Sequence, residues 1–140
     1  MSAGPRLSAL VVCHNEERQL ADCLAPLAFA DEIVVVLDRC TDGSEAIARA
    51  AGARCIAGAW PLEGDRRNAG IDTCSGDWIV EVDADERMPP ELAAELARCF
   101  QTDDMVELFE ILDVDQMGQV SIHEFCQELT KVVISERSVD

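Results

Sequence analysis

The sequence predicts an α/β fold in which a parallel β-sheet with covering helices is followed by a small all-helical module. Residues before about position 100 alternate between short β-branched runs and helix-like stretches opened by polar residues, which is typical of consecutive βαβ units. The composition then changes, because every alanine lies at or before residue 97 and the only lysine is Lys131. We therefore expect two parts, residues 1–100 and residues 101–140.

The expected strands are four apolar runs, at residues 7–13, 32–38, 54–57 and 77–83. Helix-like stretches separate them, in the order "EERQLADCLAPL", "DGSEAIARAAG" and "GDRRNAGIDTCSG". Gly52 stands where the second stretch should end, and Gly76 precedes the fourth strand. A further helix is expected at residues 89–100, because proline suits the first turn of a helix.

Charge and cysteine usage limit the class of function. The 140 residues carry a formal net charge of −17. Nucleic acid and anionic membranes carry charge of the same sign, so the charge argues against binding them by general electrostatic attraction and favours cations as partners. The seven cysteines form no C-x-x-C pair, and no histidine stands at zinc-ligand spacing. We interpret them as the reduced thiols of a cytoplasmic protein. The apolar run at residues 7–13 is too short for a membrane span or a signal-peptide core.

The segment "DVDQMGQVSIHE" at residues 113–124 has the spacing of a twelve-residue calcium loop. Gly118 at loop position 6 permits the sharp turn. Met117 stands at position 5, where its thioether is a poor calcium ligand that a water would replace. The expected Ca²⁺ ligands are oxygen donors at five positions: Asp113, Asp115, the backbone carbonyl of Gln119, Ser121 and Glu124.

Apolar residues recur at helical spacing on both sides of this loop, in "MVELFEIL" and "FCQELTKVV". Loop and flanks together resemble a single EF-hand over about residues 102–134. The resemblance implies Ca²⁺ binding by a helix-loop-helix module. Because EF-hands usually work in pairs, it also implies docking on a second EF-hand by homodimerisation, or on the α/β part. The alternative interpretation is an acidic helix–turn–helix that binds no ion.

Four short motifs follow one another in the first part: "CHNEE" (13–17), "LDRCTD" (37–42), "RRNAG" (66–70) and "VDADE" (82–86). In this order they resemble the family-2 glycosyltransferases of GT-A fold, and in particular bacterial enzymes that add sugars to lipopolysaccharide cores or other cell-surface glycans. The resemblance covers about the first ninety-six residues. It implies a Rossmann-like sheet equivalent to the donor half of the fold, truncated after the D-x-D motif, with a nucleotide-diphosphate sugar as ligand.

The D-x-D motif is the expected site of a divalent cation. Asp83 and Asp85 are two residues apart, so an extended chain directs them to the same side. Such a pair suits Mg²⁺ or Mn²⁺ held jointly with diphosphate oxygens. By resemblance Asp85 is the direct ligand, and Asp83 contacts the ribose or the metal.

The resemblance also implies contacts to the nucleotide from earlier motifs. Asn15 and Glu16 border the nucleotide, and Arg67 faces its base or phosphate. Asp38 and Asp42 hold base and ribose, although the family more often has aspartate where Leu37 stands. The alternative for Arg66 and Arg67 is a helix surface that balances local acid, and His14 and His123 are expected at ordinary loop and helix-surface positions.

No catalytic base is assigned, because the family's acceptor-binding stretch after the metal motif is replaced by the calcium-loop segment. The sheet is expected to leave the edge of its fourth strand exposed or paired with another copy. Three interpretations follow: a donor-binding segment, capable of hexosyl transfer if active, coupled to a calcium module; a calcium-binding interaction protein with a catalytically inactive α/β scaffold; or a gene-fusion fragment.

Overall fold

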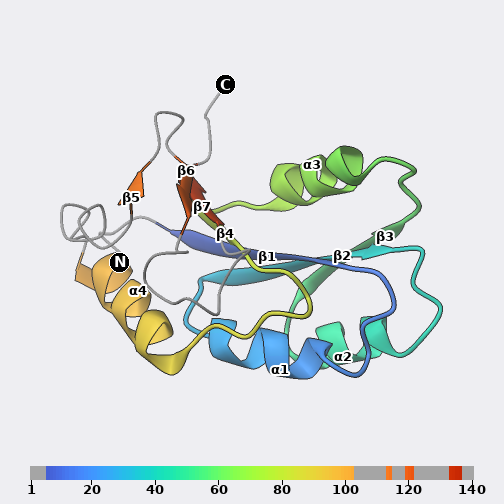
Figure 1. Cartoon of the computed structure of the whole chain (residues 1–140), viewed down its shortest axis with the longest axis horizontal. Coiled ribbons are helices and arrows are strands. Elements are labelled where there is room, and N and C mark those ends of the chain that lie inside the picture. The colour runs from blue at the N-terminus through green and yellow to red at the C-terminus, as the bar shows by residue number, and fades with distance from the viewer. Residues whose placement is uncertain (1–5, 103–112, 115–118, 122–132, 137–140) are drawn as a thin grey trace.

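The computed structural model describes residues 6–102, 113–114, 119–121 and 133–136. A twisted sheet runs through its centre (Figure 1). The parallel part of the sheet has the order β3-β2-β1-β4, with β1 (Leu7–Cys13), β2 (Glu32–Asp38), β3 (Arg54–Gly58) and β4 (Trp78–Glu81). The predicted parallel sheet is confirmed, with β4 shorter at both ends than expected.

Strand β1 lies where the strand order reverses. The chain runs outward from β1 through β2 to β3 and then returns to place β4 on the other side of β1. In the parallel register, Leu10 of β1 stands opposite Val34 of β2 and Glu81 of β4. In open α/β sheets, ligands bind beyond the carboxyl ends of the strands at such a reversal. The topology therefore marks the ends of β1 and β4 as the place for a site.

The helices cover both faces of the parallel sheet. Figure 1 shows α3 on one face and the other helices on the opposite face. Alternate side chains of β1 pack against the helices on opposite faces of the sheet. Ala9 and Val11 belong to the larger core, with α1 and α4, and Leu10 belongs to a smaller core beneath α3. The helices are α1 (Leu20–Leu24), the 3-10 turn η1 (Ala25–Leu27), α2 (Ser44–Ala50), α3 (Glu63–Thr73) and α4 (Pro90–Thr102).

Three short strands extend the sheet beyond β4. β7 (Val133–Glu136) pairs antiparallel with β4, β6 (Gln119–Ser121) pairs with β7, and β5 (Asp113–Val114) pairs with β6. The expectation that the edge of the fourth strand is exposed or paired with another copy is therefore wrong, because β7 of the same chain covers it. The expectation of an all-α tail is not confirmed, because each described residue beyond α4 is in a strand. The helices expected around the calcium loop lie outside the described residues except for Val133, which begins β7.

Within the described ranges, no helix has the length and apolarity that crossing a membrane requires.

Replacing Gly70 by alanine is expected to destabilise the fold by about 1–3 kcal/mol. A Cβ there would lie 2.5 Å from Leu10 Cδ1 and 2.8 Å from Val36 Cγ2, since α3 approaches the sheet closely at this position. Gly64 of the same helix is the matched control, because a Cβ there meets nothing within 4 Å. Gly64→Ala should leave stability unchanged or raise it by about 0.5 kcal/mol. Urea unfolding followed by circular dichroism measures both, and equal stabilities would contradict the close packing.

Candidate functional site

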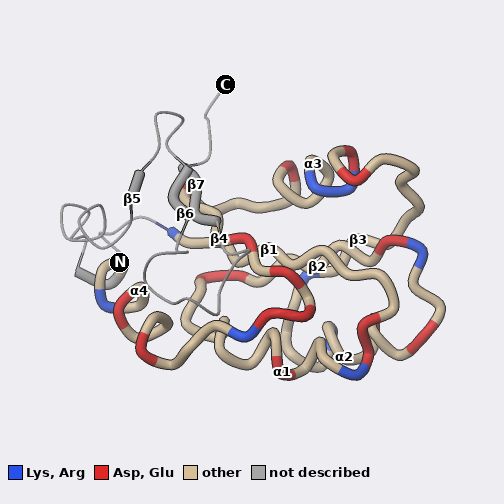
Figure 2. Tube along the Cα trace, viewed as in Figure 1, with Lys and Arg blue, Asp and Glu red and all other residues tan. Residues whose placement is uncertain are grey.

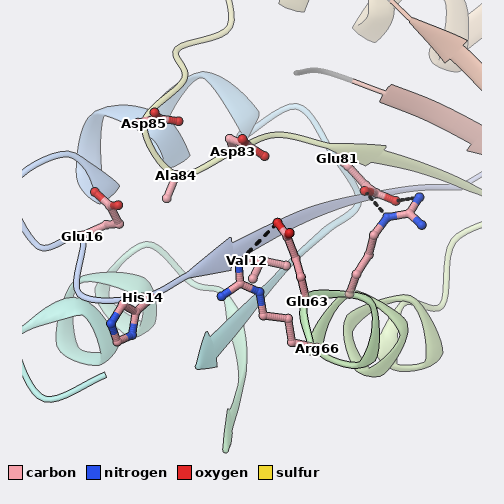
Figure 3. Close-up of a pocket in the computed structure, with 10 residues that line it drawn as sticks. Val12, His14, Glu16, Glu63, Arg66, Glu81, Asp83, Ala84 and Asp85 are labelled. Atoms are coloured by element: carbon pink, nitrogen blue, oxygen red, sulfur yellow. Dashed lines mark hydrogen bonds and ion pairs between the residues drawn. The ribbon is translucent and has the colours of Figure 1, made fainter. Parts of the chain in front are cut away.

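A cleft opens at the carboxyl ends of β1 and β4, where the strand order reverses. Its volume is about 330 Å³. Figure 3 shows side chains that enter it from the end of β1 and the following loop, from α3, and from β4 and the segment after it. The polar residues that line it are His14, Glu16, Glu63, Arg66, Arg67, Glu81, Asp83 and Asp85.

Asp83 and Asp85, the predicted metal-binding pair, both line this cleft. Val82 and Ala84, which alternate with them, are buried. The chain is not extended across the pair, because residues 84 and 85 lie in a turn. In this turn the Glu86 amide donates a hydrogen bond to the Asp83 carbonyl oxygen at 2.9 Å. Both residues thus reach one cleft, but the expected alternation of an extended chain does not hold across the pair.

A buried thiol holds this turn from the side of α1. Cys23 Sγ donates a hydrogen bond to the backbone carbonyl oxygen of Asp83 at 3.3 Å. Burial raises the pKa of the Cys23 thiol to about 12. The thiol therefore keeps its proton at neutral pH and remains a donor. The backbone of Asp83 is in this way fixed from α1 as well as from β4.

The donor set fits a cation that shares its coordination sphere with a ligand. Within the described residues, no group of three or more His, Cys, Asp or Glu side chains is arranged to hold a metal ion. Mg²⁺ prefers octahedral oxygen coordination and usually takes only one or two carboxylates from the protein, with waters and substrate phosphates completing the set. Asp83 and Asp85 offer such a pair of carboxylates at an open cleft. They suit an ion held together with a phosphate ligand better than a permanent structural metal.

Acidic side chains dominate the cleft. Five carboxylates line it against two guanidinium groups, so its formal charge is −3 with His14 neutral. Figure 2 shows the same excess of acidic over basic residues along the described chain. An anionic ligand that enters alone is repelled by this charge, and one that enters with a divalent cation is not.

Arg67, predicted to face a nucleotide, lies in the cleft in a bidentate ion pair. Its Nε donates to Glu81 Oε2 at 2.8 Å and its Nη2 donates to Glu81 Oε1 at 2.7 Å. The hydrogen bonds from Arg67 to Glu81 raise the pKa of Arg67. Sequence reasoning missed Glu81. Its signal is its place at the end of β4, two residues before Asp83.

Asp38 ends β2 behind the cleft and does not line it. Oδ1 accepts from Arg39 Nε at 3.1 Å and from the Trp60 amide at 3.0 Å, and Oδ2 accepts from Arg39 Nη2 at 3.1 Å and from Arg66 Nη1 at 2.9 Å. Burial by itself raises the pKa of this carboxyl, but the donors from Arg39, Trp60 and Arg66 outweigh it and hold the pKa well below its usual range. Asp38 is therefore a buried carboxylate that stays ionised.

The side chains of Asn15 and Asp42 connect the loop after β1 to the loop after β2. Neither residue lines the cleft. Asn15, with φ of 52°, accepts with Oδ1 from the amides of Thr41 at 2.7 Å and Asp42 at 3.3 Å. Asp42 accepts with Oδ1 from the Ser44 amide and hydroxyl at 2.9 and 2.6 Å, and with Oδ2 from the Glu17 amide at 3.2 Å. The hydrogen bonds from Ser44 lower the pKa of Asp42. These two side chains thus shape the loops from which Glu16 reaches the cleft.

His14, expected at an ordinary loop position, lies in the cleft wall. Its Nδ1 is 2.7 Å from the backbone carbonyl oxygen of Asp38, which ties the end of β1 to the end of β2. Glu63 and Arg66 reach the same cleft from α3. Sequence reasoning named Glu63 in no role, and it assigned Arg66 no contact with a ligand.

The predicted calcium ligands fall in two groups. Asp113 lies in β5, and Gln119 and Ser121 lie in β6, where the register pairs Asp113 with Ser121. Asp115 and Glu124 lie outside the described residues.

Together, the parallel sheet, the reversal at β1 and the acidic cleft define an α/β fold of the sugar-nucleotide-binding type. The chain belongs to glycosyl transferase family 2, whose family model matches residues 8–123. The predicted resemblance to this family is confirmed. The matched residues run past position 100, and the division into residues 1–100 and 101–140 stays a prediction.

Two curated relatives show the extent of the likeness. The chain is 31% identical over 96 residues to an uncharacterized glycosyltransferase of Rickettsia felis, with 68% of this chain and 34% of that protein covered. It is 32% identical over 95 residues to the lipopolysaccharide core biosynthesis glycosyltransferase LpsC of Rhizobium meliloti, with 61% and 34% covered. The chain thus spans about a third of the length of these relatives.

Solved structures share the fold. Glucosyl-3-phosphoglycerate synthase of Mycobacterium tuberculosis superposes with a TM-score of 0.63 at 21% identity, over 97% of this chain and 59% of that one. Its complex with Mn²⁺, UDP and glucosyl-3-phosphoglycerate gives 0.59 at 23%, over 72% and 41%. The mannosyltransferase PcManGT of Pyrobaculum calidifontis, in complex with GDP-Man and Mn²⁺, gives 0.58 at 21%, over 70% and 33%. These likenesses confirm the expected GT-A fold.

Replacing Asp38 by asparagine is expected to lower the thermal unfolding midpoint at neutral pH by several degrees and to matter less in acid. Because the pKa of Asp38 is lowered in the folded state, its ionised form stabilises the fold fully above the ordinary aspartate pKa of about 4. That contribution is lost as pH falls through the folded-state value. Melting curves of wild type, Asp38→Asn and the exposed control Asp72→Asn between about pH 7 and pH 2.5 measure this. A difference between wild type and Asp38→Asn that does not shrink below about pH 4 would contradict the assignment.

Proposed function

We propose that this chain binds a nucleoside-diphosphate sugar together with Mg²⁺ or Mn²⁺ in the cleft at the carboxyl ends of β1 and β4. The observation that carries the proposal is the paired Asp83 and Asp85, which open onto a cleft of about 330 Å³ with a net negative lining. Membership of glycosyl transferase family 2 supports the same ligand class. So do the contents of related structures, which hold UDP or GDP-Man with Mn²⁺.

In this proposal Asp85 is the direct ligand of the cation, and Asp83 shares the cation or contacts the ribose. Asp85 is exposed and Asp83 is half-buried, so the outer carboxylate is the freer to meet an incoming ion. When bound, a divalent ion neutralises the diphosphate and stabilises it as a leaving group. Glu16 forms part of the facing wall, which borders the nucleotide.

Arg67 supplies positive charge to the same cleft. Its guanidinium is held by both carboxylate oxygens of Glu81, which fixes its position and offsets its charge. The remaining N–H groups of a bidentate arginine still point outward and can donate to a ligand. Arg67 thus offers hydrogen bonds to base or phosphate without adding a large net charge.

Hexosyl transfer is the reaction that family membership favours. The described residues offer the donor side of that reaction, and none of them is assigned as a base for an acceptor hydroxyl. The chain spans about a third of its curated relatives. We therefore limit the proposal to donor binding.

Replacing Asp85 by alanine is expected to weaken binding of UDP-sugar or GDP-sugar in the presence of Mn²⁺ by at least about tenfold. Trp78 lies in β4, which leads into the metal motif, and the Trp60 amide binds Asp38 behind the cleft. Intrinsic fluorescence therefore serves as the measurement. Asp72→Ala removes an exposed carboxylate of α3 outside the cleft and should leave affinity unchanged. Equal affinities of wild type and Asp85→Ala would refute the metal assignment.

Calcium binding by residues 113–124 is a second candidate function. The loop spacing of Asp113, Asp115, Gln119, Ser121 and Glu124 supports it. The pairing of Asp113 with Ser121 also brings loop positions 1 and 9 opposite each other. We propose a single EF-hand in residues 101–140, with a second copy of the chain as its pairing partner. Under this proposal the α/β part acts as donor-binding segment or as scaffold.

Calorimetry with Ca²⁺ is expected to show one site per chain with a dissociation constant between micromolar and millimolar values. Glu124→Gln should abolish the binding heat, because it removes the carboxylate that would close the coordination sphere with two oxygens. Glu136→Gln, outside the twelve-residue loop, is the control. Both variants are measured in the Asp85→Ala background, so that binding at the cleft does not contribute. A wild-type heat no larger than that of Glu124→Gln refutes the candidate function.

A further inference from the structure

Arg66 is turned inward from the surface of α3. A helix-surface arginine ordinarily extends its guanidinium into water, where each N–H is solvated. The side chain of Arg66 is only 23% exposed, and it lines the cleft. Its Nε is buried without a hydrogen-bond partner. An unpaired buried donor costs stability, so another contact must hold this side chain in its inward orientation.

An ion pair with Asp38 holds the side chain of Arg66 in this inward orientation. Arg66 Nη1 donates to Asp38 Oδ2 at 2.9 Å, and this carboxylate is fully buried. The second partner of Arg66 is Glu63, 3.5 Å from Nη2 and 87% exposed. A contact to so exposed a carboxylate is weak and easily replaced. The guanidinium is therefore anchored at Nη1 and open to exchange of partners at Nη2.

The Asp38 carboxylate has no acceptor site left for a ligand. An ionised carboxylate offers about four lone-pair directions, and four donors occupy them: two from Arg39, one from Arg66 and the Trp60 amide. A nucleotide hydroxyl or base N–H would have to displace one of these donors. The Asp38 carboxylate thus fixes the positions of the groups that donate to it.

Figure 3 shows where the anchored guanidinium lies. Arg66 stands across the cleft from Asp83 and Asp85, with Glu63 beside it. A ligand whose phosphates meet a cation at Asp83 and Asp85 would extend toward Arg66. Its oxygen atoms could take the place of the Glu63 carboxylate at Nη2.

We propose that Arg66 is a nucleotide-binding residue and that Asp38 is a positioning residue, which acts on the nucleotide through Arg66 and makes no contact with it. The ligand chemistry is an oxygen acceptor, from the diphosphate or from the base or ribose. The inference rests on the proposed function, because it concerns the same nucleotide. It differs from the expectation that Asp38 holds the nucleotide directly.

A double-mutant cycle tests this assignment. The affinity of the Mn²⁺ complex of UDP is measured for wild type, Arg66→Ala, Asp38→Asn and the double variant, after melting curves establish that each is folded. Arg66→Ala should weaken binding by about 10- to 100-fold, as for a lost hydrogen bond to a charged group. Asp38→Asn should weaken it about tenfold in wild type and less than about twofold in the Arg66→Ala background, because its effect passes through Arg66.

Arg39→Ala is the matched control and keeps the test decisive if Asp38→Asn does not fold. Arg39 binds the same carboxylate as Arg66 but is 54% exposed and does not line the cleft. A merely structural role of the cluster predicts equal losses of affinity from Arg39→Ala and Arg66→Ala, whereas the assignment predicts a loss from Arg66→Ala alone. Equal losses overturn it.

The remaining outcomes are distinct. A penalty of Asp38→Asn that is the same in both backgrounds means direct contact and overturns this inference while the proposed function stands. Absence of nucleotide binding by wild type overturns both. Inorganic pyrophosphate with Mn²⁺ identifies the acceptor: a loss of pyrophosphate affinity in Arg66→Ala assigns the contact to phosphate, and a loss confined to UDP assigns it to base or ribose.

Discussion

The pairing of β1 with β2 on one side and β4 on the other is the constraint on which the cleft depends. Because β1 is central and parallel to both neighbours, its carboxyl end and those of β2 and β4 meet at one edge of the sheet. The loops that leave these strands must then share a small space. His14 and Glu16 follow β1, Asp38 ends β2, and Asp83 follows β4, so the polar residues converge without being close in sequence.

Charge pairing fixes several of these polar groups in place. Asp38 is buried and would be costly alone, and Arg39 and Arg66 compensate it. Glu81 binds Arg67 through both of its oxygens. Each arginine of α3 is therefore fixed by a carboxylate of a strand. The carboxylates of Asp83 and Asp85 lie at the open side, and that side of the cleft remains strongly negative.

Sequence reasoning predicted the strands and the position of the cleft, because both depend on local order: β-branched runs and loops at strand ends. The metal-binding role of Asp83 and Asp85 stays a prediction, and a turn rather than strand alternation brings both residues to the cleft. Sequence reasoning did not find the contacts of Asp38, Asn15 or Asp42. Those depend on which loops pack side by side, and a carboxylate in a loop looks the same whether it meets solvent, an amide or an arginine. The covering of β4 by β7 was missed for the same reason, since strand pairing across some fifty residues leaves no local pattern.

The acidity of the cleft has a consequence for how its ligands enter. A formal charge of −3 on the lining groups opposes a nucleoside diphosphate, which is itself an anion. Under the proposed function, a divalent cation reduces that opposition twice, by neutralising Asp83 and Asp85 and by neutralising the phosphates. Cation and nucleotide are then coupled, and by thermodynamic reciprocity each must raise the affinity of the cleft for the other. Because Arg66 and Arg67 are already paired with carboxylates, they add little net positive charge. Their N–H groups act mainly by orienting the ligand through hydrogen bonds. Under the proposed function, the metal therefore determines whether the nucleotide binds, and the fixed guanidinium groups determine how it lies.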